Sequence, residues 1–214
     1  MKFVIFDMDG TMLDTMYYWS NVLPLYAQQH GLEIPEIDEK HLLKAEEMPT
    51  YDGLMFLKQL YSHEAVQKID ENAVLEVMEN IYNSGAPLKP GVLELLENLK
   101  NRNVKMCVIS ATPTRLVKIA LKKAGIAGYF EFILSPDDYP KGKADPEIFK
   151  AASKLFGCNL NEMTLFEDAL YSMIVAKSLG IKVVAVKDKY EQNNYSEIVK
   201  TADIFLNDFT EYEL

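Results

Sequence analysis

Two aspartates, Asp7 and Asp9, stand one residue apart near the start of the chain, and Gly10 follows them at once. A carboxylate is ionised at pH 7 and needs no base to activate it, so Asp7 could attack a phosphorus atom directly. Like-charge repulsion raises the pKa of a second carboxyl nearby, and Asp9 could then give a proton to a leaving alcohol. Gly10 permits a sharp turn that exposes backbone N–H groups to an anion. A lone motif of this kind can also be a turn or a calcium-like loop, so its interpretation depends on what else reaches the same place.

Three later segments bring further polar groups, namely Ser110, Lys143 and the pair Glu167-Asp168. Taken alone, each has an ordinary explanation. Ser110 could cap the next helix, Lys143 could be a solvated lysine, and an acidic pair is favoured at a helix N-terminus. All of them follow apolar runs, as Asp7 does, and this shared order favours one common site.

A site that gathers four carboxylates needs a cation, because the carboxylates repel one another. The four are Asp7, Asp9, Glu167 and Asp168. These candidates offer only oxygen, and the three histidines of the chain have no metal-ligand spacing, so Mg²⁺ is the expected cofactor. Mg²⁺ commonly bridges to a phosphate, and the lysine ammonium and the serine hydroxyl could bind other phosphate oxygens. The residue types therefore favour a phosphoryl group as the ligand.

A scaffold must bring these residues together from distant parts of the chain. Apolar runs without polar alternation predict strands buried on both faces at residues 2–6, 104–109, 130–134, 164–166, 182–186 and 204–206. Helix-length segments lie between them at 91–100, 114–123, 146–156 and 171–179. This alternation predicts an α/β fold with a Rossmann-like parallel sheet flanked by helices. Ligands bind such sheets at the carboxyl ends of the strands, where the polar groups would meet.

Residues 15–85 interrupt the alternation of strands and helices. The stretch has no convincing strand, and it contains helical periods such as residues 73–82. It predicts an all-α cap domain inserted into a core made of residues 1–14 and 86–214. Because the insert follows the first strand directly, we expect it above the carboxyl ends of the strands.

The cap is expected to choose the substrate. Its loop at residues 46–53 is the predicted specificity element, and Lys44 and Lys58 are weaker candidates for contacting an anionic substrate tail. Trp19 belongs to an aromatic cluster that suggests packing in the first cap helix, although it lies close enough to the start of the cap to face the site.

The net charge and the cysteines limit the partners and the cellular compartment that we expect. The net charge of −10 argues against binding to nucleic acid or an anionic membrane, which requires a clustered basic face. Cys107 and Cys158 lack disulfide spacing and are expected to be free thiols, as in a reducing cytosol. The N-terminus lacks the apolar stretch of a signal peptide, and no run approaches 18 apolar residues. We therefore expect a cytoplasmic protein, with a monomer favoured.

The order DMDGT, VISAT, GKADPEIF and LFEDA resembles the four motifs of the haloacid dehalogenase-like hydrolase superfamily. The resemblance is to subfamily I with a helical C1 cap, in the branch of phosphoglycolate phosphatases and β-phosphoglucomutases. The segment LKPGVLELLENLK, from Leu88, also looks like the part of such proteins that re-enters the core after the cap. Dehalogenases of the family have another residue in place of Asp9 and use no metal, so the resemblance implies phosphoryl transfer.

Carried over by position, the resemblance implies a role for each motif residue. Asp7 would be the nucleophile, Asp9 the acid and base, and Ser110 and Lys143 the phosphate ligands. Mg²⁺ would bind Asp7, Asp168 and the backbone carbonyl of Asp9, with Glu167 as an additional or supporting ligand. Contacts to the substrate are expected from Thr11, Ala111, Thr112 and Trp19.

The expected activity is Mg²⁺-dependent hydrolysis of a small organic phosphate monoester through an aspartyl-phosphate intermediate. A phosphomutase of the β-phosphoglucomutase type is the enzyme alternative, but sugar phosphomutases of similar build have a histidine where this chain has Trp19, together with a cap arginine. Here Arg102 and Arg115 both fall outside the cap. A phospho-acceptor regulatory domain would combine similar residues, and the long insert after the first strand speaks against it. A purely structural or metal-binding role is the remaining alternative.

Overall fold

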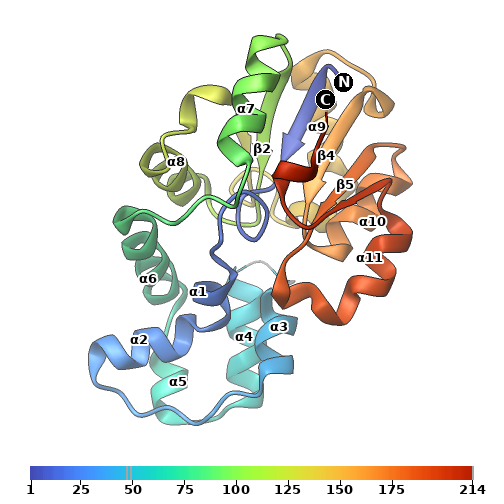
Figure 1. Ribbon diagram of the computed structural model, residues 1–214. Helices are drawn as coiled ribbons and strands as arrows, with labels where there is room; N and C mark the ends of the chain where they lie inside the picture. The colour runs from blue at the N-terminus through green and yellow to red at the C-terminus, as the bar shows by residue number, and fades with distance from the viewer. Residues whose placement is uncertain (47, 49, 214) are drawn as a thin grey trace.

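A single parallel sheet forms the centre of the molecule in the computed structural model, which describes residues 1–46, 48 and 50–213 (Figure 1). Its six strands have the order β3-β2-β1-β4-β5-β6. They are β1 (Phe3–Phe6), β2 (Lys105–Ile109), β3 (Ile133–Leu134), β4 (Met163–Glu167), β5 (Lys182–Val186) and β6 (Ile204–Leu206). The expected α/β fold is confirmed. Strand order reverses direction between β1 and β4, which is where open parallel sheets bind their ligands.

Both faces of the sheet are covered, which explains the lack of polar alternation in its strands. Val4 and Phe6 of β1 point to one face, and Ile5 points to the other. The first face is packed by α7 (Val92–Asn101) and α8 (Thr114–Lys123). The second is packed by α9 (Pro146–Phe156), α10 (Leu170–Ser178) and α11 (Tyr195–Thr201). Short 3₁₀ segments complete this layer structure: η1 (Ala127–Tyr129), η2 (Gly142–Ala144), η3 (Leu160–Glu162), η4 (Lys189–Asn194) and η5 (Phe209–Glu211).

Among the described residues, six helices lie between β1 and α7, and they gather below the sheet in the view of Figure 1. They are α1 (Met16–Ser20), α2 (Val22–His30), α3 (Glu39–Glu46), α4 (Thr50–Leu60), α5 (Glu64–Lys68) and α6 (Glu71–Ser84). The last of these includes the helical period expected at residues 73–82. The boundaries assigned to core and cap from the sequence stay a prediction, and these helices are called the cap below.

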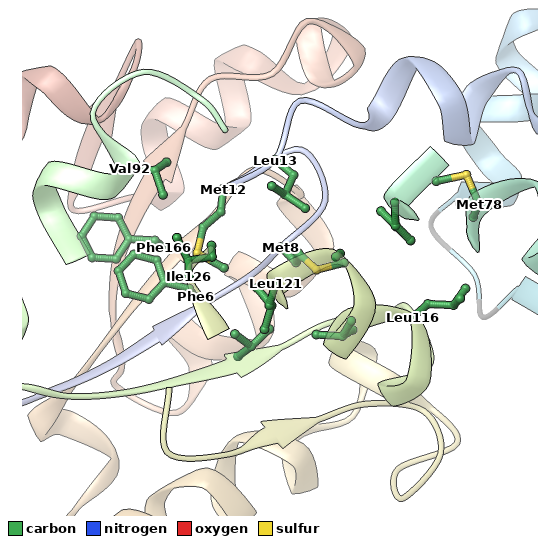
Figure 2. Close-up of a cluster of buried hydrophobic side chains, with 14 of the residues drawn as sticks. Phe6, Met8, Met12, Leu13, Met78, Val92, Leu116, Leu121, Ile126 and Phe166 are labelled. Carbon is green, nitrogen blue, oxygen red and sulfur yellow. The ribbon is translucent and has the colours of Figure 1, made fainter. Parts of the chain in front are cut away.

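The chain leaves and re-enters the core through two segments that lie side by side. Leu13 and Leu88 form an antiparallel bridge, Asp14 N donates to Pro87 O at 3.0 Å, and Lys89 N donates to Met12 O at 2.9 Å. One apolar cluster runs from the sheet into the cap past these segments, and Figure 2 shows Phe6 and Phe166 at its sheet end and Met78 on its cap side. Cap and core are thus joined by paired backbone and by continuous packing.

The structure departs from the expected elements at several places. The strand expected at 130–134 is limited to Ile133–Leu134, because η1 ends just before it and leaves Phe130 and Phe132 as connections at the sheet edge. The segments η4 and α11 were not anticipated from the sequence.

The two cysteines are free thiols, as expected. In the described part of the chain, every helix is too short or too polar to cross a lipid bilayer.

Candidate active site at the carboxyl ends of the strands

Asp7 lies at the centre of the site because β1 lies at the centre of the sheet. Its N–H donates to Phe166 O on β4 at 3.0 Å, which extends the ladder by one residue and fixes the backbone. The Lys143 ammonium, from η2, contacts Asp7 Oδ1 at 2.8 Å and Glu167 Oε2 at 2.9 Å. All three side chains are almost completely buried. The structure therefore brings Lys143 onto the predicted nucleophile from 136 residues away.

The charges in this cluster do not balance. Burial alone would lower the pKa of Lys143, but the carboxylates of Asp7 and Glu167 raise it well above its ordinary value, so the ammonium stays charged. Burial, followed by the charges of Asp7 and Glu167, raises the pKa of Asp168 well above its usual range. The pKa of Glu167 is raised by burial and by Asp7, against the opposing effect of Lys143. One ammonium thus faces three crowded carboxyl groups.

This imbalance fits a bound divalent cation. One carboxylate oxygen from each of Asp7, Glu167 and Asp168 lies within 4.8 Å of the other two. Such oxygen donors suit a hard metal ion, and a positive charge among them would offset the repulsion between the three carboxylates. The Asp9 carboxylate lies outside this group, so the prediction that Asp9 binds the metal concerns its backbone carbonyl and stays a prediction.

Gly10 and Thr11 shape the turn that carries the acids. Gly10 has φ +77°, and a Cβ atom there would lie 2.3 Å from Asp168 Oδ2, so only glycine fits. Thr11 is fully buried and its hydroxyl donates to Asp168 Oδ1 at 2.6 Å. The structure gives the Thr11 side chain a role in holding Asp168, and the predicted contact between Thr11 and substrate stays a prediction.

Three hydroxyl groups hold the Asp9 carboxylate. Thr15 and Tyr82 donate to Asp9 Oδ1 at 2.7 and 2.6 Å, and Thr112 donates to Asp9 Oδ2 at 2.8 Å. The pKa of Asp9 is nevertheless raised, because burial outweighs these hydrogen bonds and the Asp7 charge adds to it. Burial, together with the nearby Asp9 charge, holds the pKa of Tyr82 well above its ordinary value, so this phenol is a proton donor to the carboxylate.

The segment after β2 lies beside the acids. Ser110 is buried, and its Oγ accepts a hydrogen bond from Thr112 N at 3.0 Å. Ser110, Ala111 and Thr112 all face the same cavity as Asp7 and Lys143. The structure therefore gathers the residues predicted from all four motifs, while their contacts with substrate stay predictions.

The cavity above these residues has a volume of about 320 Å³. The surface on the core side, called the core floor, contains the polar and charged residues Asp7, Asp9, Ser110, Lys143, Glu167 and Asp168. The surface on the cap side, called the cap wall, consists mainly of apolar side chains: Trp19, Val22, Leu23, Leu54, Leu57 and Val74. A charged phosphoryl group and an organic leaving group would thus meet surfaces of different character.

Only some of the cap residues predicted to determine specificity line the cavity. Lys44 and Lys40, both on α3, line the cavity. Lys58 instead donates to the Gln67 carbonyl at 2.9 Å and is not among the described lining residues. The prediction of a loop at 46–53 is wrong for most of its length, because α3 includes Glu46 and α4 begins at Thr50. Residues 47 and 49 lie outside the described residues, while Met48 and Gly53 line the cavity.

Several residues of the site were not found from the sequence. Tyr82 stood in a predicted helix without any motif, and its position at the end of that helix, next to the return into the core, was the available signal. Tyr171 lines the cavity, with its ring centroid 5.8 Å from Lys143 Nζ. The segment η4 lines the cavity through Tyr190, Glu191, Asn193 and Asn194.

A buried ion pair places η4 against the return segment from the cap. Lys89 Nζ contacts Asp188 Oδ2 at 2.8 Å and Lys187 O at 2.9 Å. Asp188 also accepts a hydrogen bond from Tyr190 N at 3.0 Å, which starts the 3₁₀ turn. No local sequence pattern links residues 99 positions apart, so this arrangement needed the structure.

Comparisons with known proteins agree with this geometry. Residues 4–186 match the family model described as haloacid dehalogenase-like hydrolase. The phosphorylated carbohydrates phosphatase of Thermotoga maritima is 26% identical over 182 residues, covering 85% of this chain and 83% of that protein. Hexitol phosphatase B of Escherichia coli is 22% identical over 207 residues, covering 97% and 92%. The crystal structure of β-phosphoglucomutase from Clostridium difficile has a TM-score of 0.80 at 22% identity, covering 100% of this chain and 94% of that one, which shows a shared fold.

Proposed function

The chain belongs to the haloacid dehalogenase-like hydrolase family, and on that basis we propose that it is a Mg²⁺-dependent phosphatase of small organic phosphate monoesters. The observation that carries the proposal is the buried contact of Asp7 with Lys143 beside the Glu167-Asp168 pair. This arrangement presents a carboxylate to a cavity whose floor also offers an ammonium and a hydroxyl for phosphate oxygens. Relatives that are named phosphatases support the same reaction class.

The first step transfers the phosphoryl group to Asp7. A carboxylate has two oxygens, so Asp7 can keep its contact with Lys143 through one and attack phosphorus with the other. The bond between phosphorus and the ester oxygen breaks, and Asp9 gives its proton to that oxygen. The products are the alcohol and an aspartyl phosphate. Lys143 and Ser110 would hold the phosphoryl oxygens during the transfer.

The second step restores the enzyme. Water attacks the phosphorus of the aspartyl phosphate, and Asp9 takes a proton from that water. The bond between phosphorus and the Asp7 oxygen breaks, which releases inorganic phosphate and regenerates the carboxylate. The raised pKa of Asp9, caused first by its burial, suits a group that must both give and receive a proton near neutral pH.

The cofactor in this proposal is Mg²⁺, held by Asp7, Asp168 and the backbone carbonyl of Asp9, with Glu167 next to them. When bound, the ion would offset the negative charge of the carboxylates and the phosphoryl group, so that one anion can approach another. Thr11 fixes Asp168 for this task through its 2.6 Å hydrogen bond.

The cap wall would hold the alcohol part of the substrate. Trp19 and the neighbouring apolar side chains cover the core floor and would exclude bulk water from the reacting groups. Thr112 and Ala111 border the same space from the core. Motion of the cap on its paired linkers would admit the ester and release the alcohol.

A phosphate-release screen tests this function. Purified protein with Mg²⁺ is offered sugar phosphates, phosphoglycolate and nucleotides, and inorganic phosphate is measured. We expect release from at least one monoester, loss of release after chelation, and recovery when Mg²⁺ is added back. Asp7→Asn keeps the size of the side chain but removes the nucleophile, so we expect turnover to fall at least about 1,000-fold.

Asp203→Asn is the matched control, because it makes the same chemical change at an aspartate remote from the cavity. It should leave turnover unchanged. If Asp7→Asn kept full turnover, the assigned nucleophile would be wrong. Isomerisation of a sugar phosphate without net phosphate release would instead identify a phosphomutase.

A further inference from the structure

Tyr82 is a cap residue that reaches the acid of the core. We propose that its hydroxyl is a positioning group that orients Asp9 for proton transfer to the leaving alcohol, so that this transfer requires the cap to be seated. The inference rests on the proposed function, in which Asp9 supplies that proton. Tyr82 itself contacts neither substrate nor metal in this proposal and acts only through Asp9.

The direction of the hydrogen bonds around Tyr82 is fixed by chemistry. The indole N–H of Trp19 can only donate, and it points to the Tyr82 hydroxyl at 3.2 Å. The hydroxyl therefore accepts from Trp19, and its single proton is directed to Asp9 Oδ1 at 2.6 Å. The result is an ordered chain of donors that runs from Trp19 through Tyr82 to the carboxylate.

The other two donors to Asp9 come from segments next to the core motifs. Thr15 lies directly before α1 and shares Oδ1 with Tyr82, while Thr112 follows β2 and binds Oδ2. These contacts hold both oxygens of the carboxylate. Tyr82 is the donor that comes from the far end of the cap, 73 residues along the chain.

The position of Tyr82 makes its contact with Asp9 depend on the cap. The side chain is completely buried, near the last turn of α6, directly before the chain returns to the core. Helix α6 packs on core helix α8, and Arg115 and Glu79 form an ion pair between them. Hydrogen bonds from a hydroxyl to oxygen span about 2.5–3.0 Å, so a displacement of α6 by about 1 Å would remove this donor from Asp9.

Tyr82→Phe tests the proposal, because it deletes the hydroxyl and keeps the ring in its packing. Two esters of similar size separate the proton transfer from other effects. Benzyl phosphate releases an alcohol that must be protonated, whereas p-nitrophenyl phosphate releases a phenolate that leaves without a proton. We expect kcat/KM for benzyl phosphate to fall by about 10- to 100-fold and that for p-nitrophenyl phosphate by less than about threefold, with KM little changed.

Tyr61→Phe is the matched control. Its hydroxyl is also in the cap and accepts from Asp38 N and contacts His41 Nδ1, each at 2.8 Å, but it lies outside the cavity. It should leave kcat/KM for both esters unchanged. A double variant provides the second test. Once Asp9→Asn has removed the acid, adding Tyr82→Phe should not lower kcat/KM for benzyl phosphate any further.

Three results would overturn the inference. Tyr82→Phe could leave kcat/KM for benzyl phosphate within twofold of wild type, or it could lower kcat/KM for both esters equally. Its effect could also add fully to that of Asp9→Asn. Equal loss on both esters would mean that Tyr82 serves packing. Failure of the wild-type protein to release phosphate from these two esters and from every ester of the screen would contradict the proposed function itself, which is a distinct outcome from wild-type turnover that is unchanged in Tyr82→Phe.

Discussion

The core floor and the cap wall of the cavity differ in chemistry and in how their residues are held. The floor is made of buried charged and polar side chains tied to one another by hydrogen bonds, such as Lys143 to Asp7 and Thr11 to Asp168. The wall is made largely of apolar side chains that belong to the packing of the cap helices, such as Leu57 and Val74. Floor residues can therefore dictate the reaction, while wall residues can change without disturbing it.

The two regions also reach the cavity by different routes. Each floor residue ends a strand, follows one directly or lies in the connection after one, so the register of a parallel sheet sets its position. Wall residues come from helices α1, α2, α4 and α6, whose arrangement depends on mutual packing. Tyr82 is a polar link between them, because it lies in the cap and donates to Asp9 of the floor. Changes in the floor should abolish activity, and changes in the wall should alter selectivity.

Among the substitutions that test the difference between core floor and cap wall, Lys143→Met should have the largest effect on stability and turnover. It removes the ammonium from between Asp7 and Glu167 and leaves buried carboxylates unpaired. We expect a loss of about 3 kcal/mol in the free energy of unfolding, by analogy with other broken buried ion pairs. Turnover should be lost with every ester tested. Chemical denaturation and phosphate release measure the two effects, and a variant with wild-type stability would show that Lys143 does not hold the acids together.

Metal binding should be the next largest effect and should be confined to the floor. Because burial and then the charges of neighbouring carboxylates raise the pKa values of Asp168 and Glu167, a cation that offsets their charge should stabilise the fold. At 100 times its dissociation constant, Mg²⁺ would add about 2.7 kcal/mol to the free energy of unfolding. Thermal unfolding with and without Mg²⁺ measures this, and Asp168→Asn should remove most of the increase. An equal increase in both proteins would place the ion elsewhere.

Gly10→Ala should disturb the floor through the backbone. The substitution places a methyl group against Asp168 Oδ2 at a residue with φ +77°, where a side chain is strained in any case. We expect a cost of about 2 kcal/mol in stability and weaker Mg²⁺ binding. Gly31→Ala is the matched control, since Gly31 has φ +62° and nothing lies within 4 Å of the added atom. If both variants bound Mg²⁺ equally well, the close approach of Gly10 to Asp168 would have no functional role.

Trp19→Phe should give a smaller effect that depends on the substrate. The change shortens the cap wall and removes the N–H that contacts Tyr82. We expect kcat/KM to fall about fivefold, or about 1 kcal/mol, for esters with a bulky alcohol. Acetyl phosphate, whose leaving group is small and needs no proton, should be hydrolysed at the wild-type rate. Equal losses on both substrates would contradict the division between floor and wall.

Asp203→Asn shows how much stability changes when a charged residue outside both the core floor and the cap wall is replaced. Burial raises the pKa of Asp203, but the hydrogen bonds from Lys177 and Val183 N lower it by more, so the net pKa lies below its ordinary value. A depressed carboxyl pKa stabilises the fold above the ordinary pKa, and this stabilisation is lost as the pH falls through the folded-state pKa. We expect the variant to cost less than about 1 kcal/mol at neutral pH, since the pair is partly exposed. Denaturation at neutral and acidic pH should show the difference shrinking with acidity.

The same contrast explains what could be predicted from the sequence. Asp7, Ser110 and Glu167 could be placed together because each follows an apolar strand, and parallel strands present their carboxyl ends at one edge. The strand at 130–134 was overestimated because Phe130 and Phe132 are half-buried at the edge of the sheet and continue its apolar pattern, although only Ile133 and Leu134 pair with β2 as a strand. Local pattern therefore suffices where a strand sets the position of a residue.

Positions set by packing between distant helices could not be obtained in this way. Tyr82 has the sequence signature of an ordinary buried helix residue, and only the approach of α6 to the turn after β1 makes it a partner of Asp9. The ion pair of Lys89 with Asp188 likewise depends on how the return segment meets η4. The helical nature of the cap could be predicted, but its contacts with the floor required the coordinates.

The central claim is that the Asp7 carboxylate receives the phosphoryl group. A rapid acid quench of the enzyme during turnover of a ³²P-labelled monoester, followed by peptide mapping, tests it directly. We predict label on Asp7, with more label in Asp9→Asn when the ester is p-nitrophenyl phosphate, because its leaving group needs no proton and only the base that activates water is then missing. Turnover without label on Asp7, or with label on another residue, would contradict the account.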